Sequence, residues 1–182
     1  YDELEGSDHS KLFANWLTVA QSRLSDSRTG LLISSYRFNG TRLDGPEGSS
    51  IWMSAHNLSW IDPRFGRTQY DRARSLLGRS LFGFGYAREW PPEGSSPMDI
   101  DSGVALPLLG AGPSSSAMSL LGAVTFADDD FAGQILASLN FGAFPVRTAD
   151  GLRYQASNAL GDSVIMYALL QGAIRRRALQ SS

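Results

Sequence analysis

The sequence predicts an all-α fold that forms half of an (α/α) toroid, built of three helical hairpins with short β-hairpins in the long loops. Three observations predict it. Six segments have helical periodicity, amphipathic segments alternate with segments that are apolar on all sides, and short connections alternate with long ones. A helix that is apolar on all sides must be covered on most of them, whereas an amphipathic helix faces water. The alternation therefore indicates an inner layer of helices wrapped by an outer layer.

The three amphipathic segments are predicted to be the outer helices. The first follows the sequence GSDHS and extends to about Leu24. The second starts at Pro63, a residue that is favoured in the first turn of a helix, and extends to about Phe82. The third covers about Asp129–Asn140. In each segment apolar residues three or four positions apart form one stripe, which indicates the face that packs on the inner layer.

The three inner helices are expected at about Ser50–Ile61, Ser115–Phe126 and Asp162–Ile174. Each is followed or preceded by a connection of characteristic length. The links from an inner to an outer helix are very short, and the links from an outer to an inner helix are long, at about 25–49, 83–113 and 141–161. In antiparallel hairpins all the long links fall at one end, together with the N-termini of the inner helices. Long loops gathered on one face are a common place for a functional site.

Two of the long links contain candidate β-hairpins. The sequence TGLLISSYRFNGTRLD combines β-branched and aromatic residues with a turn at Asn39–Gly40, and FPVRTADGLRYQ has a turn at Asp150–Gly151. We expect both to be short hairpins that lie beside the helices.

Composition excludes several classes of function. The net charge of −2 gives no electrostatic basis for binding nucleic acid or an anionic membrane. No apolar run approaches the ~20 residues of a membrane span. The chain has no cysteine, which excludes disulfides, thiolate zinc sites and a cysteine nucleophile and leaves the cellular compartment open. We expect neither a cofactor nor a metal ion.

Three hairpins make only half of a closed ring of six. We therefore expect residues 1–182 to be one domain that corresponds to the C-terminal half of such a ring, with the N-terminal half absent from this chain. An open half would expose apolar inner helices along one side, which is unfavourable for a monomer. The expected partners are the missing half, another chain or a second copy of this one, together with a small-molecule substrate.

The segment IWMSAHNLSWI contains the first candidate site residues. Trp52, His56 and Ser59 are spaced i, i+4 and i+7, so they share one stripe of the predicted helix. They indicate either a pocket wall with an aromatic platform and a titratable imidazole, or a packed core helix with one hydrogen-bonded histidine. Both interpretations remain open for this stripe.

Asp99 and Asp101, in the sequence MDIDSG, are the second candidate pair. Spaced i and i+2 in an extended or irregular segment, they can point to the same side. Two close carboxyls raise the pKa of one of them, which provides an acid and a base from one loop. The alternative is a turn in which both aspartates cap backbone amides.

Further candidates lie on the long loops at the predicted mouth of the ring. Glu47, Trp90, Arg153, Tyr154 and Asn158 are suited to contacts with a substrate. Glu47 also suits the first turn of the following helix without any chemical role, because helix N-termini attract negative charge.

A family resemblance is carried by four segments, in the order LSDSRTGLLISSY, WMSAHNLSWIDPRFGRTQY, DIDSGVALPLL and GLRYQASNALGDSVIMYALLQG. In order and spacing they resemble the C-terminal half of the linalool dehydratase-isomerase family and its uncharacterised bacterial relatives. The resemblance implies an (α/α)₆ barrel with an active site at one mouth. It also implies cofactor-independent removal or migration of a tertiary or allylic hydroxyl on a small alcohol.

The same resemblance implies roles for particular residues. Trp52 matches a tryptophan of the family's pocket, Arg153 and Tyr154 match positions in it, and Asp99 and Asp101 stand near the aspartates of a family loop. The acid–base groups of the linalool enzyme, including two cysteines, come mainly from its N-terminal half, so this chain departs from the family pattern there.

We therefore expect an enzyme domain that dehydrates or isomerises a hydroxylated small molecule, with Asp99, Asp101 and His56 as catalytic groups completed by residues outside this chain. Two alternatives are open. Paired carboxyls and aromatic platforms also suit a carbohydrate-active toroid, such as a glycosidase, lyase or epimerase. A non-catalytic binding or interaction module would use the same acids as backbone caps.

The aspartate pair generates a direct prediction. Asp99→Asn or Asp101→Asn should abolish activity with little loss of stability, because each removes a titratable proton and keeps the size of the side chain. Turnover and thermal unfolding of each variant check this. Strong destabilisation instead would identify the pair as structural.

Overall fold

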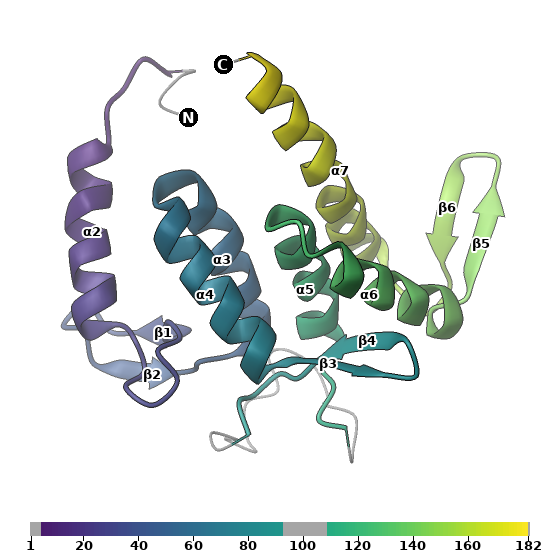
Figure 1. Ribbon diagram of the computed structural model, residues 1–182, viewed down its shortest axis with the longest axis horizontal. Helices are drawn as coiled ribbons and strands as arrows, with labels where there is room; N and C mark the ends of the chain where they lie inside the picture. The colour runs from purple at the N-terminus through teal and green to yellow at the C-terminus, as the bar shows by residue number, and fades with distance from the viewer. Residues whose placement is uncertain (1–4, 93–108, 182) are drawn as a thin grey trace.

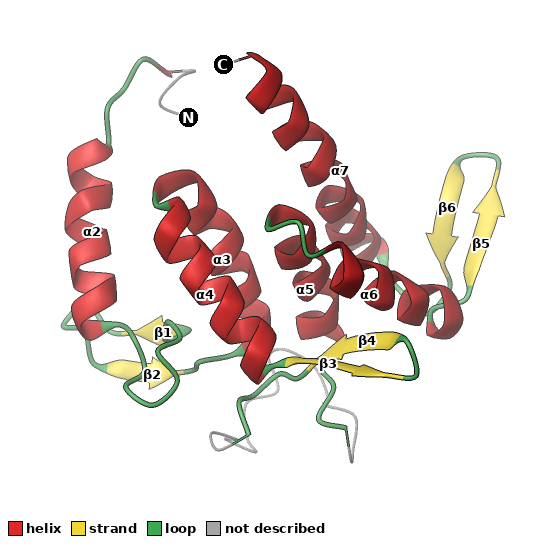
Figure 2. Cartoon of the chain, viewed as in Figure 1, coloured by secondary structure: helices red, strands yellow, loops and turns green. Residues whose placement is uncertain are grey.

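The computed structural model describes residues 5–92 and 109–181. In this part, six helices and three two-stranded antiparallel sheets make a helix-rich fold (Figures 1 and 2). The prediction of a helical fold is confirmed at this level, although three β-hairpins mean that the fold is not purely all-α. The helices are α2 (Ser10–Arg23), α3 (Gly48–Ile61), α4 (Pro63–Leu76), α5 (Pro113–Thr125), α6 (Asp129–Gly142) and α7 (Ala159–Ser181).

Helices α3, α5 and α7 form a continuous layer in which α5 lies between the other two (Figure 1). Helix α4 packs on α3 and helix α6 packs on α5, so two of the predicted outer helices cover their expected inner partners. Helix α2 lies at the edge next to α3 and α4 and fully buries only Ala20. The described part is thus a layer of inner helices that is covered unevenly.

Aromatic side chains fill the space between the two layers. The ring of Trp52 on α3 lies 5.8 Å from that of Tyr70 on α4 and 6.3 Å from that of Phe131 on α6, measured between centroids. Tyr70 also stacks on Phe126, at the end of α5, at 4.9 Å. The rings of Trp52, Tyr70 and Phe131 are all buried, so they supply much of the apolar stabilisation of the fold.

The two hairpins predicted from turn sequences are confirmed. Strands β1 (Ser35–Tyr36) and β2 (Arg42–Asp44) pair across the turn at Asn39–Gly40. Strands β5 (Pro145–Thr148) and β6 (Gly151–Tyr154) pair across a turn at Ala149–Asp150, one residue before the predicted Asp150–Gly151. In both cases the turn residues were a sufficient signal.

The third hairpin, β3 (Gly78–Leu81) and β4 (Phe84–Ala87), corrects the prediction for the preceding helix. Helix α4 ends at Leu76 and not at about Phe82. Leu77 and Leu81 continue the apolar spacing of α4, which made the helix look longer. Phe82 and Gly83 both have positive φ angles, of 51° and 84°, and form the two-residue turn that separates the strands.

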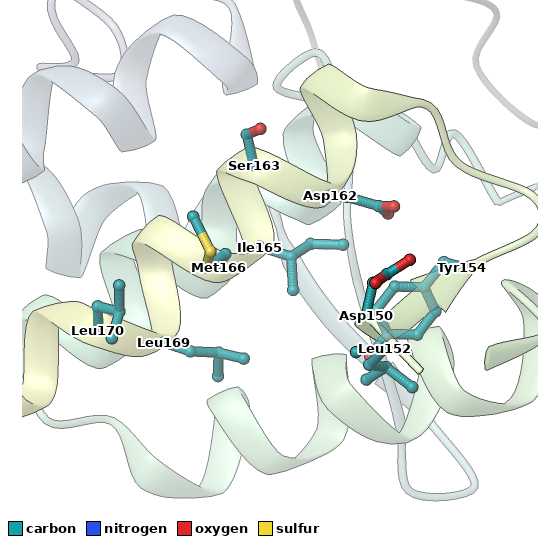
Figure 3. A pocket seen from close by; sticks show the side chains of 10 residues that line it. Asp150, Leu152, Tyr154, Asp162, Ser163, Ile165, Met166, Leu169 and Leu170 are labelled. Atoms are coloured by element: carbon teal, nitrogen blue, oxygen red, sulfur yellow. The ribbon is translucent and has the colours of Figure 1, made fainter. Parts of the chain in front are cut away.

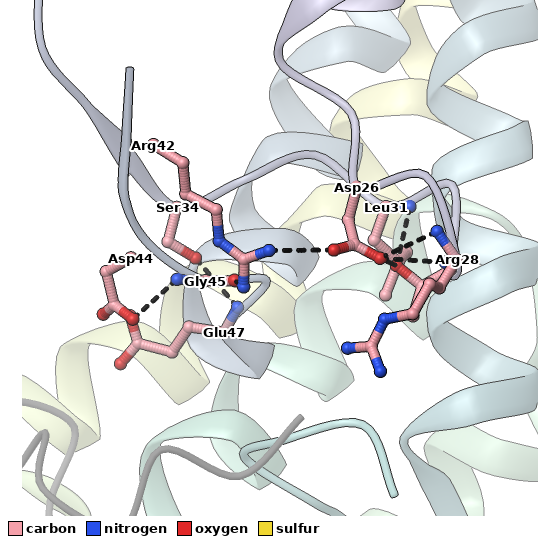
Figure 4. A network of polar contacts seen from close by, with 9 residues as sticks. Asp26, Arg28, Leu31, Ser34, Arg42, Asp44, Gly45 and Glu47 are labelled. Carbon is pink, nitrogen blue, oxygen red and sulfur yellow. Dashed lines mark hydrogen bonds and ion pairs between the residues drawn. The ribbon is translucent and has the colours of Figure 1, made fainter. Parts of the chain in front are cut away.

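A polar network fixes the loop between α2 and α3 (Figure 4). The carboxylate of Asp26 accepts hydrogen bonds from the backbone amides of Arg28 and Thr29, at 3.1 and 2.9 Å, and pairs with Arg42 at 2.9 Å. Burial alone would raise the pKa of Asp26, but these hydrogen bonds and the charge of Arg42 together lower it. The loop is therefore held by a charged carboxylate.

Asp128 connects the two outer helices that cover the core. Its Oδ1 accepts a hydrogen bond from the amide of Phe131 at 3.1 Å, which caps α6. Its Oδ2 accepts one from the hydroxyl of Tyr70 at 2.7 Å and one from Nε of Arg74 at 3.1 Å, both on α4.

None of the helices in the described part has an apolar stretch long enough to cross a bilayer.

Replacing Asp128 by alanine should destabilise the protein by about 2 kcal/mol, because the change removes a helix cap and leaves the buried Tyr70 hydroxyl without its acceptor. Asp129→Ala, at the next residue in the first turn of α6, is the matched control and should cost only ~0.5 kcal/mol. Urea unfolding of both variants measures the difference. Equal losses would contradict the role assigned to Asp128.

Candidate functional site

The first turns of α3, α5 and α7 lie at the same end of the molecule. The residues that follow β4 hold two of them together, since the amide of Gly48 donates to the carbonyl of Glu89 at 2.7 Å and the hydroxyl of Ser115 donates to the carbonyl of Arg88 at 2.8 Å. A cavity of about 330 Å³ is lined by the first turns of α5 and α7 and by the last turn of α6. The sequence predicted that the long links and the N-termini of the inner helices meet at this end, which is called the mouth below.

Glu89 occupies the position between the first turns of α3 and α5. Its side chain is buried, with 2% of the residue exposed. The carboxyl oxygen Oε1 accepts a hydrogen bond from the amide of Ser49 at 2.9 Å. The other oxygen, Oε2, is buried and has no hydrogen-bond partner among residues 5–92 and 109–181. Buried polar atoms are nearly always paired, and in the described part only Oε1 of Gln134 and Oδ1 of Asp162 share this property.

Burial raises the pKa of the Glu89 carboxyl, because the charged form loses its hydration. The amide and hydroxyl of Ser49 and the amide of Ser115 act in the opposite direction without cancelling the effect. The protonated form therefore persists to higher pH than in an exposed glutamate. A raised pKa is the property that a carboxyl needs to act as a general acid.

Two glycines allow the close approach of these elements. A Cβ atom on Gly112, just before α5, would collide with Oε2 of Glu89. A Cβ atom on Gly48 would collide with Oγ of Ser115. Both positions therefore require the absence of a side chain, and the site is closely packed around the carboxyl.

Trp52 lies in the core and not in a pocket wall. Its side chain is fully buried, and its indole Nε1 donates a hydrogen bond to Oγ of Ser115 at 3.1 Å. This bond links α3 to α5. The position corresponds to the packed-helix interpretation of the stripe that contains Trp52.

His56 links all three inner helices. Its Nδ1 lies 2.7 Å from Oγ1 of Thr125 on α5, and its Nε2 lies 3.0 Å from the hydroxyl of Tyr167 on α7. The histidine is buried, and its ring meets that of Tyr167 edge to face at 5.6 Å. Both ring nitrogens are thus used in hydrogen bonds within the inner layer, as the interpretation of a hydrogen-bonded core histidine requires.

Three other predicted residues lie at the mouth. Glu47 is half-buried at the N-cap position of α3, and its Oε2 accepts a hydrogen bond from Oγ of Ser50 at 3.3 Å. Asn158 is exposed and caps α7, where its Oδ1 accepts a hydrogen bond from the amide of Gly161 at 2.9 Å. Trp90 is half-buried and follows Glu89 directly. The structure brings these residues to one end, where Glu47 and Asn158 serve the helix termini.

Tyr154 lies in the wall of a groove of about 490 Å³ between α7 and the β5–β6 hairpin (Figure 3). Burial raises the pKa of its hydroxyl, and the nearby charge of Asp162 raises it further. Asp162 has a buried oxygen, Oδ1, without a hydrogen-bond partner in the described part of the chain. Arg153 is exposed and lines a separate cavity. The other groove residues include Asp150, Leu152, Ile165, Met166, Leu169 and Leu170.

Asp99 and Asp101 lie outside the described residues. The residues on either side of their segment meet at the mouth, because Arg88 and Ala111 form an antiparallel bridge and the amide of Gly112 donates to the carbonyl of Ala87 at 3.0 Å. Among the residues that the structure does describe, no group of three or more histidine and acidic side chains is arranged to bind a metal ion.

Glu89 was missed by the sequence analysis, although the sequence contains a signal for it. In an extended strand alternate residues point to the same side. Gly85, Ala87 and Glu89 are alternate residues and all three are buried. Once β4 is recognised, this alternation places Glu89 on the buried side. Because α4 was predicted to extend to about Phe82, strand β4 was not recognised, and the burial of Glu89 was therefore not predicted.

No protein-family model matches the chain, and no curated protein matches it. The resemblance to the linalool dehydratase-isomerase family therefore remains a prediction from the four sequence segments.

Replacing Glu89 by glutamine should make stability less dependent on pH. Because the pKa of Glu89 is raised above its ordinary value of 4.5, the folded state binds more protons than the unfolded state above that pH. The contribution of Glu89 to stability therefore falls as the pH rises from 4.5 through the raised pKa. We expect the free energy of unfolding, measured in urea over this range, to fall less in Glu89→Gln. Parallel curves for the two proteins would contradict the buried, protonated carboxyl.

Proposed function

We propose that this chain is an acid–base enzyme domain that dehydrates or isomerises a hydroxylated small molecule at the mouth formed by the inner helices. The observation that supports it most is Glu89, a carboxyl that is 2% exposed, has a raised pKa and keeps one oxygen without a partner in the described part. Burial of this carboxyl is unfavourable, and the hydrogen bonds from Ser49 and Ser115 offset the loss of hydration only in part, so the pKa stays raised. A catalytic role explains why the position is occupied by an acid.

Dehydration of an alcohol needs a proton donor and a base. In the proposed step, the carboxyl proton of Glu89 passes to the substrate hydroxyl, the C–O bond breaks, and water leaves with the bonding electrons. The carboxylate then removes a proton from the adjacent carbon, and the C–H electrons form the double bond. The alcohol becomes an alkene and water, and the carboxyl of Glu89 is restored.

Substrate specificity would come from the surroundings of the carboxyl. Trp90 follows Glu89 directly and is half-buried, and the proposal assigns its indole to a carbocation-like transition state. The segment that contains Asp99 and Asp101 leaves from and returns to this end, because its described neighbours are joined there. We keep these two aspartates as acid–base or hydroxyl-binding groups. His56 is a structural link in this proposal.

The proposed scaffold is half of an (α/α)₆ barrel. The layer formed by α3, α5 and α7, and the covering of α3 by α4 and of α5 by α6, support this architecture. The resemblance to the linalool dehydratase-isomerase family supports the same architecture and the class of alcohol. The other half of the ring would come from residues outside this chain or from another copy, and would complete the site.

A non-catalytic binding module is the second candidate. The observation that favours it is the use of predicted site residues in structural hydrogen bonds: Trp52 bonds to Ser115, and Asn158 caps α7. In that case the mouth binds a hydroxylated ligand without converting it.

Incubation with a panel of allylic and tertiary alcohols of five to ten carbons, with detection of alkenes by gas chromatography and mass spectrometry, tests the proposal. We expect turnover in the wild type and a loss of about 10²–10⁴-fold in Glu89→Gln. The control, Asp130→Asn in the exposed first turn of α6, should keep full activity. Calorimetric binding of an alcohol without turnover would favour the second candidate. Wild-type rates in Glu89→Gln would exclude the proposed acid.

A further inference from the structure

Among the described residues, no outer helix covers α7 in the way that α4 covers α3 and α6 covers α5. Helix α4 covers α3 and helix α6 covers α5, whereas the extensive helix contacts of α7 in the described part are with α5 (Figure 1). Met166, Leu169 and Leu170 of α7 are consequently exposed, and they line the groove beside the β5–β6 hairpin (Figure 3). The groove is therefore an inner-helix surface without its cover.

The groove is apolar along its length and acidic at one end. Its acidic residues are Asp150 and Asp162, and none of the residues that line it is basic. Oδ1 of Asp162 is buried and has no hydrogen-bond partner among the described residues. The surface thus fits an amphipathic partner that carries a basic group at the matching end.

Helix α2, at the opposite edge of the molecule, has the complementary character (Figure 1). Leu12, Val19 and Arg23 lie on one stripe of this helix, and all three are exposed. The helix contains no acidic residue, and Arg23 is in its last turn. It therefore offers an apolar stripe that ends in a positive charge.

We propose that a second copy of this chain covers α7 with its own α2, in the outer position that α4 takes on α3 and α6 takes on α5. The inference rests on the ring architecture proposed above. If α2 packs antiparallel to α7, as outer helices do in hairpins, Arg23 of the second copy meets Asp162.

The spacing along both helices agrees with this arrangement. Arg23 and Val19 are four residues apart, and so are Asp162 and Met166. In the antiparallel arrangement, a contact between Arg23 and Asp162 therefore also brings Val19 of α2 against Met166 of α7. A two-fold axis would repeat the contact, so that each copy covers the other, and six hairpins would close into one ring.

Sedimentation equilibrium tests the proposal. We expect a mass of twice the 19.7 kDa chain. Val19→Glu on α2 and Leu169→Glu on α7 should each raise the dissociation constant at least about tenfold, because each buries a charge in an apolar contact. The matched control is Leu43→Glu on β2, where the leucine is 55% exposed compared with 47% for Leu169, and it should leave the mass unchanged.

A charge exchange tests the orientation. Arg23→Glu and Asp162→Arg should each weaken the dimer, and the two together should restore it. Circular dichroism checks that every variant is folded. A monomer at all concentrations, a dimer that resists the substitutions at Val19 and Leu169, or a failure of the exchange to restore association would overturn the proposal. A monomer that still dehydrates an alcohol through Glu89 would overturn the proposed dimer, but it would leave the proposed function intact.

Discussion

The extension of β4 through residues Ala87, Arg88 and Glu89 holds the inner layer together at one end. Its carbonyl groups accept hydrogen bonds from the amide of Gly48, the hydroxyl of Ser115 and the amide of Gly112. These bonds satisfy donors at the starts of α3 and α5, which would otherwise be buried without partners. The position of α5 between α3 and α7, and hence of everything that packs on it, depends on this junction.

At this junction the backbone carbonyl groups of residues 87–89 already cap the starts of α3 and α5. The same segment also contains an acidic side chain, that of Glu89. Oε1 of Glu89 accepts a hydrogen bond from the amide of Ser49, and the hydroxyl of Ser49 and the amide of Ser115 also stabilise the charged carboxyl. By contrast, Trp52 and His56, which have the side chains more often associated with chemistry, are engaged in bonds that tie the inner helices to one another. Trp52 and His56 thus hold the layer together, whereas the raised pKa of Glu89 indicates a carboxyl whose burial is unfavourable.

Periodicity predicted the six helices, and turn residues predicted two of the hairpins, because both signals are local. The β3–β4 hairpin was missed because Leu77 and Leu81 preserve the spacing of a helix, and only the pairing of Leu81 with Phe84 reveals strands. Glu89 was missed for a related reason, since its burial depends on contacts with α3 and α5, which are distant in sequence. The choice between core and pocket for His56 likewise depended on Thr125 and Tyr167, whose positions no local pattern could give.

The central claim is that Glu89 is a buried carboxyl that stays protonated above the ordinary pH range of a glutamate. Carbon-13 NMR of protein labelled at the glutamate side-chain carboxyl measures this directly, with the resonance assigned by its loss in Glu89→Gln. The account predicts a titration midpoint for Glu89 clearly above the ordinary pKa of about 4.3. A midpoint at or below that value would show a solvated or fully paired carboxylate and would contradict the account.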